Sequence, residues 1–395
     1  MDDYYVYTDH LTVGYDGVPV IENIQIGVHR GEILTLIGPN GSGKSTILKS
    51  IIRQLRLLAG TVVLDGRPMA ELTERDVARK MSILMTERMK PELMTCWDVV
   101  ATGRYPYTGR LGLLTQADRD KVDEALEMVH AVELADHSFS HISDGQRQRL
   151  LLARAICQEP EVVVLDEPTS FLDIRHKLEL LSILKTMVRE KRVAVIMSLH
   201  ELDLAQKVSD RIVCVNRRSV ERCGTPEDIF QDEYIRGLYG IERGSYDTAF
   251  GCLEMEPVQG PPKVFVIGGG GSGIPLYRLL QRRGIPFAAG ILQENDVDYP
   301  VARALAAEVI SEKPFEAVGE EAVRSALQTL DRCERTVCCT TSFGEMNRAN
   351  MVLREHARDC SLLIGIGELE QFVYKGADEH GTTAYIAGDT HGFCC

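Results

Sequence analysis

The residues best suited to chemistry begin with a glycine-rich run that follows an apolar stretch at 31–37. Glycines let backbone N–H groups close around phosphate oxygens, and a helix that starts beside them points its positive end at the same oxygens. A lysine and a serine at that helix start would neutralise the phosphates and hold Mg²⁺. The spacing G-x-x-x-x-G-K-S, the Walker A pattern, therefore predicts a phosphate cradle. Its residues are Gly38, Pro39, Asn40, Gly41, Ser42, Gly43, Lys44, Ser45 and Thr46.

Two carboxylates end a second apolar run, where Asp166 and Glu167 follow the residues VVVL. Ligands of open α/β sheets collect at the carboxyl ends of strands, so both side chains are expected near the phosphates. Asp166 fits a carboxylate in the Mg²⁺ shell, and Glu167 is placed to polarise the attacking water as a general base. A helix cap is the other explanation for such a pair, and the glycine loop upstream favours phosphate chemistry. A third apolar run, 192–200, ends in His200.

The stretch HISDGQRQRLLLARAI at 141–156 resembles the signature motif of ABC-transporter ATPases. That motif usually contains LSGGQ, where this chain has ISDGQ. The order of the motifs is also similar to the family: glycine loop, helical insert, signature, carboxylate pair, then histidine. SFLD at 170–173 resembles the family's D-loop, and Tyr15 resembles the aromatic residue that stacks on adenine. The resemblance covers nearly all of residues 1–245.

The resemblance implies a mechanism in which two copies of the chain enclose two ATP molecules head to tail, with Mg²⁺ as the metal. Lys44 and Asp166 of one copy would face the signature of the other copy across the γ-phosphate. His200 would contact that phosphate, and a strand-end histidine without a catalytic role is the alternative. The residues implied at ATP, besides the glycine loop, are Tyr15, Ser143, Gly145, Gln146 and Asp173.

The chain departs from the family pattern at two positions. The family normally places a glutamine after the strand at 81–85, where it touches Mg²⁺ and couples to the membrane partner, and this chain has Thr86 followed by Glu87. Thr86 would reach the metal only through its hydroxyl or a water, so the expected metal set is Ser45, Asp166 and Thr86. Asp144 stands where the signature motif has the first of its two glycines. Because a carboxylate near phosphates would repel them, we expect Asp144 to face solvent.

The stretch TCWDVVATGRYPYTGRLG at 95–112 resembles the ATPases of iron-siderophore, haem and cobalamin importers. That resemblance implies an integral-membrane permease as partner, a substrate-binding protein acting indirectly, and a peripheral location at the cytoplasmic face of the cell membrane. Trp97, Tyr105 and Tyr107 would then be aromatic contacts for a coupling helix of the permease. The alternative for each of them is ordinary packing within the helical insert.

Composition and charge set outer limits on the function. The chain has 395 residues, 44% hydrophobic and 26% charged, as expected for a globular protein of two domains. The net charge of −14 argues against non-specific binding to nucleic acid. Neither a signal peptide nor an apolar run long enough to span a bilayer is visible. The 11 scattered cysteines fit a reducing cytoplasm.

The motifs predict an α/β fold in two domains. Residues 1–252 would form a P-loop ATPase domain of the ABC-transporter type, with a helical insert at about 85–160. A proline-rich linker is expected at 253–263. Residues 264–395 would form a smaller, Rossmann-like α/β domain of uncertain role.

The second domain opens with another glycine run. A strand at 264–267 leads into Gly268-x-Gly270-x-x-Gly273, which fits the dinucleotide fingerprint, and Glu294 stands where a ribose-binding acid is expected. Further strands are predicted at 287–292, 336–340 and 361–366, and helices include one at 301–308. A few ABC ATPases assigned to cobalamin or haem import, notably archaeal ones, have a similar extension.

Three roles stay open for the second domain: binding a nucleotide or other phosphate, sensing the transported metal complex, or a structural or partner-binding function. Cys338 and Cys339 follow a strand, and His391 with Cys394 and Cys395 lies near the tail. We expect buried thiols and a frayed end rather than metal or redox chemistry at these positions.

The sequence as a whole predicts the ATP-hydrolysing subunit of an ABC importer for a metal chelate, namely cobalamin, a ferric siderophore or haem. The alternative is a soluble, non-transport ATPase or switch whose C-terminal domain senses a ligand. Co-purification with a many-helix permease would favour the first, and a regulated dimer without a membrane partner the second.

Overall fold

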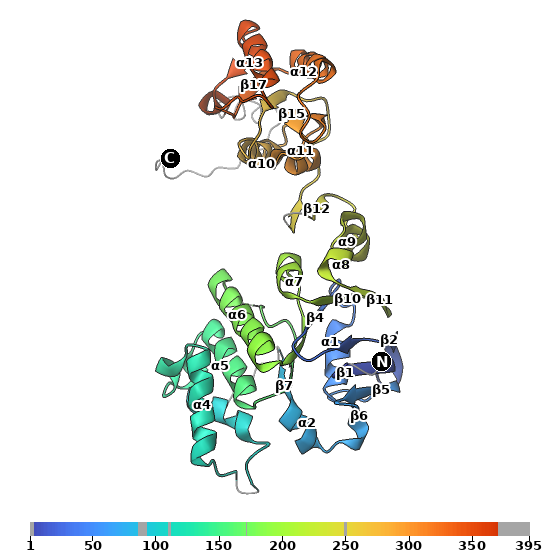
Figure 1. Cartoon of the computed structure of the whole chain (residues 1–395), viewed down its shortest axis with the longest axis vertical. Helices are drawn as coiled ribbons and strands as arrows, with labels where there is room; N and C mark the ends of the chain where they lie inside the picture. The colour runs from blue at the N-terminus through green and yellow to red at the C-terminus, as the bar shows by residue number, and fades with distance from the viewer. Residues whose placement is uncertain (1–3, 86–92, 110–111, 171, 249–250, 370–395) are drawn as a thin grey trace. The chain divides into compact units, whose positions relative to one another are not determined.

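The chain divides into two compact units in the computed structural model (Figure 1). Residues 4–85, 93–109, 112–170, 172–248 and 251–369 are described. The first unit comprises Met1–Gly240 with Thr248–Cys252, and the second comprises Ile241–Asp247 with Leu253–Cys395. Several residues of the sequence predictions lie outside the described part: Thr86, Glu87, His391, Cys394, Cys395, residue 171 of the D-loop stretch and residues 110–111 of the aromatic stretch.

A six-stranded sheet in the first unit positions the predicted site. Its strand order is β11-β10-β4-β9-β8-β7, and every neighbouring pair is parallel except β10 with β11. The bounds are β4 Ile33–Ile37, β7 Met81–Leu84, β8 Val162–Leu165, β9 Ala194–Ser198, β10 Arg211–Asn216 and β11 Ser219–Gly224. β4, β8 and β9 are buried along their whole length, which explains their continuous apolar runs. Because these three strands are parallel, the residues that follow them meet at one edge.

A second sheet, whose neighbouring strands pair antiparallel, packs with the first around α1. Its order is β2-β1-β5-β6, with β3 also paired to β1. The bounds are β1 Val6–Tyr15, β2 Val18–Ile24, β3 Gly27–Val28, β5 Ala59–Leu64 and β6 Arg67–Pro68. One hydrophobic core joins both sheets to Ile47, Leu48 and Ile51 of α1. This core fixes α1, and with it the glycine loop that precedes it.

The remaining helices of the first unit lie around these sheets. They are α1 Lys44–Ile51, α2 Glu74–Lys80, α3 Cys96–Ala101, α4 Gln116–Met128, α5 Asp144–Cys157, α6 Ile174–Lys191, α7 Leu202–Val208, α8 Pro226–Ile229 and α9 Asp232–Tyr239, with short 3₁₀ turns at Met69–Glu71, Thr102–Arg104, Val132–Leu134 and Phe139–His141. α3, α4 and α5 pack together as the helical insert, and each begins at a capping box, at Thr95, Thr115 and Ser143. No helix within the described ranges has the length and apolar character that crossing a bilayer requires.

The second unit contains a five-stranded parallel sheet in the order β16-β15-β14-β17-β18, with a hairpin of β12 and β13 before it. The strands are β12 Ser245–Asp247, β13 Cys252–Glu254, β14 Val264–Ile267, β15 Phe287–Gln293, β16 Glu308–Glu312, β17 Arg335–Cys338 and β18 Leu363–Ile364, and the helices are α10 Ile274–Arg282, α11 Asp298–Leu305, α12 Glu320–Arg332 and α13 Ala349–Asp359. α10 and α11 form one core against the sheet and α12 and α13 form another, so the predicted α/β class is confirmed.

The boundaries in the second unit correct the sequence predictions. The helix expected at 301–308 is α11, which begins and ends earlier, and residue 308 starts β16. No strand was predicted at β16, because only Ile310 of its five residues is buried and no long apolar run marks it. β17 and β18 are also shorter than the strands expected at 336–340 and 361–366.

Candidate active site

The first glycine loop connects β4 to α1 and needs glycine at specific positions. Gly38 has a φ of 147°, and a Cβ there would lie 2.0 Å from the carbonyl oxygen of Val215. Gly43 caps α1 with a φ of 103°, and a Cβ there would lie 2.4 Å from the side chain of Ile21. Since side chains would clash at both ends of the loop, the backbone can hold this curve only with glycine.

Lys44 folds back into the loop that precedes it. Its Nζ donates hydrogen bonds to the carbonyl oxygens of Gly38, at 2.7 Å, and Pro39, at 3.1 Å. Burial lowers the pKa of Lys44, and the carboxylates of Glu167 and Asp166 act in the opposite direction. The ammonium group therefore lies inside the cradle with two carboxylates nearby, which is where phosphate oxygens would need a cation.

Asp166 is fixed at the end of β8 by hydroxyl groups from two other elements. Its Oδ1 accepts hydrogen bonds from Oγ of Ser45, at 3.1 Å, and Oγ of Ser198, at 2.7 Å. The side chain is 3% exposed. A carboxylate and a hydroxyl next to a phosphate cradle are oxygen ligands of the kind that Mg²⁺ takes, so Ser45 and Asp166 fit that ion. The sequence interpretation missed Ser198, although it lies only two residues before His200.

Glu167 and His200 form the second contact at this edge of the sheet. Nε2 of His200 lies 2.5 Å from Oε1 of Glu167, while Oε2 accepts a hydrogen bond from Oγ of Ser170 at 3.2 Å. The Glu167 backbone is in the left-handed region, with a φ of 48°, and its N–H donates to Oγ of Ser198 at 2.9 Å. Non-glycine residues adopt this conformation at a cost that surrounding structure must offset, often where a side chain has to be aimed.

Tyr15 and a short cavity lie beside the glycine loop. The Tyr15 hydroxyl is 3.5 Å from Oγ1 of Thr46, and 47% of the residue is exposed, so its ring is accessible at the start of α1. A cavity of about 320 Å³ is lined by loop residues that include Asn40, Gly41 and Ser42 and by the end of α9. There the Gly38 N–H donates to the Tyr239 hydroxyl at 3.0 Å. No sequence signal pointed to Tyr239, because it approaches the loop only through the fold.

The signature residues stand at the N-terminus of α5. Oγ of Ser143 accepts a hydrogen bond from the Gln146 N–H at 3.2 Å, and the Ser143 N–H donates to Oε1 of Gln146 at 2.9 Å. Gly145 lies in the first turn beside these two residues. Asp144 is exposed and pairs with Arg147 at 2.5 Å, which confirms the expected solvent-facing position. Helix N-termini of this kind can bind anions through their backbone N–H groups.

Asp173 caps α6, the helix that follows the D-loop. Its Oδ1 accepts a hydrogen bond from the His176 N–H at 2.9 Å, and this bond lowers the pKa of Asp173. The His176 ring also lies under Gly145, 3.4 Å from where a Cβ would be. The start of α6 therefore lies next to the signature residues. Asp166, Glu167 and His200 form a separate group beside the glycine loop.

The second glycine loop, after β14, is hydrogen-bonded to side chains of its own domain. Oδ2 of Asp298 accepts from the N–H groups of Gly269, at 2.6 Å, and Gly273, at 2.9 Å. Asp296 accepts from the Gly270 N–H at 2.9 and 3.0 Å. Asp298 is wholly buried, and burial raises its pKa. The donors that a dinucleotide pyrophosphate would use are therefore already paired with carboxylates, which argues against the dinucleotide expectation.

A cavity of about 550 Å³ opens beside this second loop. It lies between the residues that follow β14 and those that follow β17, where the strand order of the sheet reverses and ligands of such sheets commonly bind. Its lining includes Asp296, Gln293, Thr340 and Asn347, and none of the described residues around it is a lysine, arginine or histidine. Glu294, the expected ribose acid, is exposed on the turn after β15.

The paired thiols at the end of β17 are partly buried. Burial raises the pKa of Cys338, and it raises the pKa of Cys339 to about 12. Burial therefore lowers the thiolate fraction of both sulfurs below that of an ordinary cysteine, and the thiolate is the nucleophilic form. The absence of metal or redox chemistry at these two thiols stays a prediction.

Comparison with known proteins agrees with these features. The ABC transporter family model matches residues 21–170, and the MJ0874 family model matches residues 287–385. The chain is 40% identical over 287 residues to an uncharacterised ABC transporter ATP-binding protein, MJ0873, of Methanocaldococcus jannaschii, covering 72% of this chain and 99% of that one.

Two further relatives have names that state a transport role. The achromobactin transport ATP-binding protein CbrD of Dickeya dadantii is 37% identical over 232 residues, or 59% of this chain and 86% of that one. The cobalamin import ATP-binding protein BtuD of Halobacterium salinarum is 30% identical over 323 residues, or 80% of this chain and 81% of that one. Together with the cradle and the carboxylates, these matches show that the chain belongs to the ATP-binding proteins of ABC transporters and carries their ATPase domain, followed by an MJ0874-family domain.

Proposed function

We propose that this chain is the ATP-hydrolysing subunit of an ABC importer for a metal chelate, either cobalamin, a ferric siderophore or haem. The observation that carries the proposal is the extent of the match to the cobalamin import protein. The match extends over 323 residues, which is longer than the predicted ATPase domain of residues 1–252. The similarity therefore continues into the C-terminal unit. The 37% identity to the achromobactin transport protein keeps siderophores among the candidates.

In the proposed mechanism the residues at the edge of the sheet act on ATP phosphates. The glycine loop and Lys44 hold the β- and γ-phosphates, and Tyr15 stacks on adenine. Ser45 and Asp166 hold Mg²⁺, with Thr86 as a further candidate, and the ion when bound offsets phosphate charge. Glu167 takes a proton from the attacking water.

The remaining residues complete that site in a dimer. His200 orients Glu167 through their 2.5 Å contact and reaches toward the γ-phosphate. Ser143, Gly145, Gln146 and Asp173 come from a second copy of the chain, where the start of α5 supplies the donors.

Coupling to a permease would use a surface of the helical insert. Tyr105 is 78% exposed and borders a cavity of about 460 Å³ that is also lined by residues of α2 and β7. Trp97 and Tyr107 are instead engaged within the insert: Nε1 of Trp97 donates to Asp123 at 2.8 Å, and the Tyr107 hydroxyl donates to the Gln158 carbonyl oxygen at 3.0 Å. We therefore propose Tyr105 as the aromatic contact and a peripheral position at the cytoplasmic face, with a substrate-binding protein involved indirectly.

The test is uptake in cells that lack this protein. Labelled cobalamin, haem and a ferric siderophore are supplied in parallel to cells carrying the wild type, Glu167→Gln, or Glu190→Gln as a control at an exposed position on α6. We expect one substrate to be taken up with the wild type and the control, and not with Glu167→Gln. Uptake that never depends on the chain would reject the importer proposal.

The cavity beside the second glycine loop favours one alternative, a soluble ATPase whose C-terminal domain senses a ligand. We take that domain as Rossmann-like, because its strand order reverses between β14 and β17. The lining carries the Asp296 carboxylate and no basic side chain among the described residues, so it suits a neutral or cationic molecule. A stable dimer whose ATPase rate changes with such a molecule, and which co-purifies with no permease, would favour this alternative.

A further inference from the structure

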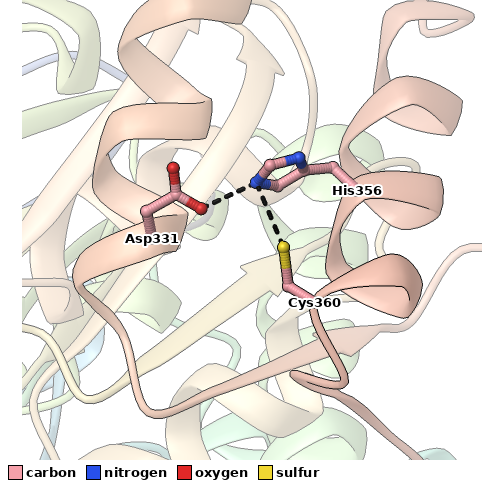
Figure 2. Close-up of side chains that lie close together, drawn as sticks. All are labelled: Asp331, His356 and Cys360. Carbon is pink, nitrogen blue, oxygen red and sulfur yellow. Dashed lines mark hydrogen bonds and ion pairs between the residues drawn. The ribbon is translucent and has the colours of Figure 1, made fainter.

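Three potential metal ligands meet where two helices of the C-terminal unit end. Asp331 lies in the last turn of α12, His356 lies in the last turn of α13, and Cys360 is the C-cap of α13 (Figure 2). α12 and α13 pack on the same face of the parallel sheet through buried residues that include Leu330 and Leu353. The core therefore fixes both helix ends, and the three side chains do not depend on a loop for their positions.

The donor atoms lie at nearly the separations that one metal ion requires. Nε2 of His356 is 3.7 Å from Sγ of Cys360 and 2.7 Å from Oδ1 of Asp331, and all three atoms lie within 4.8 Å of one another. Tetrahedral bonds to zinc place nitrogen and sulfur about 3.6 Å apart and nitrogen and oxygen about 3.4 Å apart. The first separation already fits, and the second requires Asp331 and His356 to move apart by less than an ångström.

The types and spacing of these residues limit which metal ion they would bind. His356 and Cys360 are four residues apart on one helix, the spacing by which paired ligands on a helix face grip zinc. A thiolate with an imidazole selects zinc and similar transition ions over Mg²⁺ or Ca²⁺. The guanidinium of Arg332, the neighbouring cation on α12, is directed to Glu308 at 3.0 Å. The three donors thus have no ion pair with that arginine to break.

We propose that Asp331, His356 and Cys360 bind a divalent transition metal ion of the zinc type. Cys360 is exposed and the other two side chains are 55% and 34% exposed, so a fourth position on the ion faces solvent and takes water or an incoming ligand. This site is separate from the Mg²⁺ expected at Ser45 and Asp166, and the inference does not depend on the transport proposal. The competing explanation is a plain Asp331–His356 ion pair with a thiol close by.

Cobalt binding to the purified full-length chain distinguishes the two explanations. Co²⁺ replaces zinc in such sites, and a cobalt–thiolate bond adds a charge-transfer absorption that carboxylate and imidazole ligands do not produce. Because Cys394 and Cys395 offer adjacent thiols outside the described residues, every protein in the test carries Cys394→Ser and Cys395→Ser. Chelator-treated protein without nucleotide is titrated with Co²⁺, and thermal unfolding confirms that each variant is folded.

We expect one cobalt ion per chain with the charge-transfer band, and competition by Zn²⁺. Cys360→Ser should abolish the band, and His356→Ala should weaken cobalt binding by more than about tenfold, since even loss of a residue behind a ligand costs that much. Cys252→Ser, at a partly buried thiol elsewhere, should leave the band unchanged. A titration without a band, or a band that persists in folded Cys360→Ser, would overturn the proposal.

Discussion

Both the side chain and the backbone of Glu167 are fixed by hydrogen bonds. Its two oxygens are engaged by His200 and Ser170, and its backbone adopts a left-handed conformation that an N–H bond to Ser198 supports. An immobilised carboxylate loses little freedom when a water is positioned against it, which suits a general base better than a solvent-facing cap.

Glu167→Gln should retain ATP binding and reduce hydrolysis by about 10²- to 10⁴-fold, the range for loss of a positioned base. The amide keeps the shape of the side chain and can no longer accept the proton. ATP affinity and single-turnover hydrolysis are measured on the same preparation, with Glu190→Gln as the matched control. Hydrolysis close to the wild-type rate would remove Glu167 from the role of base.

Residue types alone predicted that a glycine loop connects the strand at 31–37 to a helix, because the signal comes from residues adjacent in the sequence. Gly38 and Gly43 have positive φ angles that favour glycine, and Lys44 follows Gly43 directly in the chain. Ser198 and Tyr239 were missed because hydroxyl groups are common and only the three-dimensional approach of distant segments gives these two a function. The same holds for Asp298, whose bonds to the second loop span more than 20 residues.

At the scale of elements, α4 and α5 begin with the same capping arrangement but are expected to differ in function. Thr115 and Ser143 each form a capping box. α4 uses it only to begin a helix of the insert, where Asp118 of the box also pairs with Arg104 at 2.9 Å. α5 presents its exposed cap where the family signature is found.

Ser143→Ala and Thr115→Ala should therefore differ in activity and resemble each other in stability. Each removes one cap and should lower the free energy of unfolding by about 1 kcal/mol, as measured by urea denaturation. Only Ser143→Ala should also slow ATP turnover, because its hydroxyl is proposed to meet phosphate held by the second copy. Equal ATPase rates in the two variants would show that Ser143 acts only as a helix cap and does not contact phosphate.

Sequence patterns located the elements that are buried and misjudged those at the sheet edge. β14 and β15 were predicted almost to the residue because both are buried and lack polar side chains, apart from Gln293 at the end of β15. β16 and β18 are short edge strands with few buried residues, so their pairing comes from the neighbouring strand rather than from their own composition.

At the scale of the whole molecule, two glycine loops follow parallel strands within the described residues, and their backbone N–H groups face different side chains. The loop before α1 precedes a lysine and a serine, and the loop before α10 faces Asp296 and Asp298. Repulsion between these carboxylates and phosphate makes the second loop a poor nucleotide site. The two loops thus have similar glycine spacing, but the first is next to a lysine and the second is next to two aspartates.

The chain should consequently bind one nucleotide and not two. Titration calorimetry with a slowly hydrolysed ATP analogue and Mg²⁺ should give one site per chain, and Lys44→Ala should weaken that site strongly. NAD⁺ should show no binding to either protein. Saturable NAD⁺ binding that survives Lys44→Ala would place a dinucleotide in the C-terminal domain and refute the conclusion drawn from the aspartates.

The aspartates on the second loop have a consequence for what the C-terminal domain can report. A loop that accepts ATP, ADP or NAD⁺ would let the domain follow the energy and redox state of the cell. Asp298 is wholly buried and its carboxylate accepts hydrogen bonds from two loop N–H groups, so we expect this loop not to bind nucleotides. If the domain passes a signal to the ATPase, we therefore expect that signal to follow a compound other than the adenylates or NAD⁺.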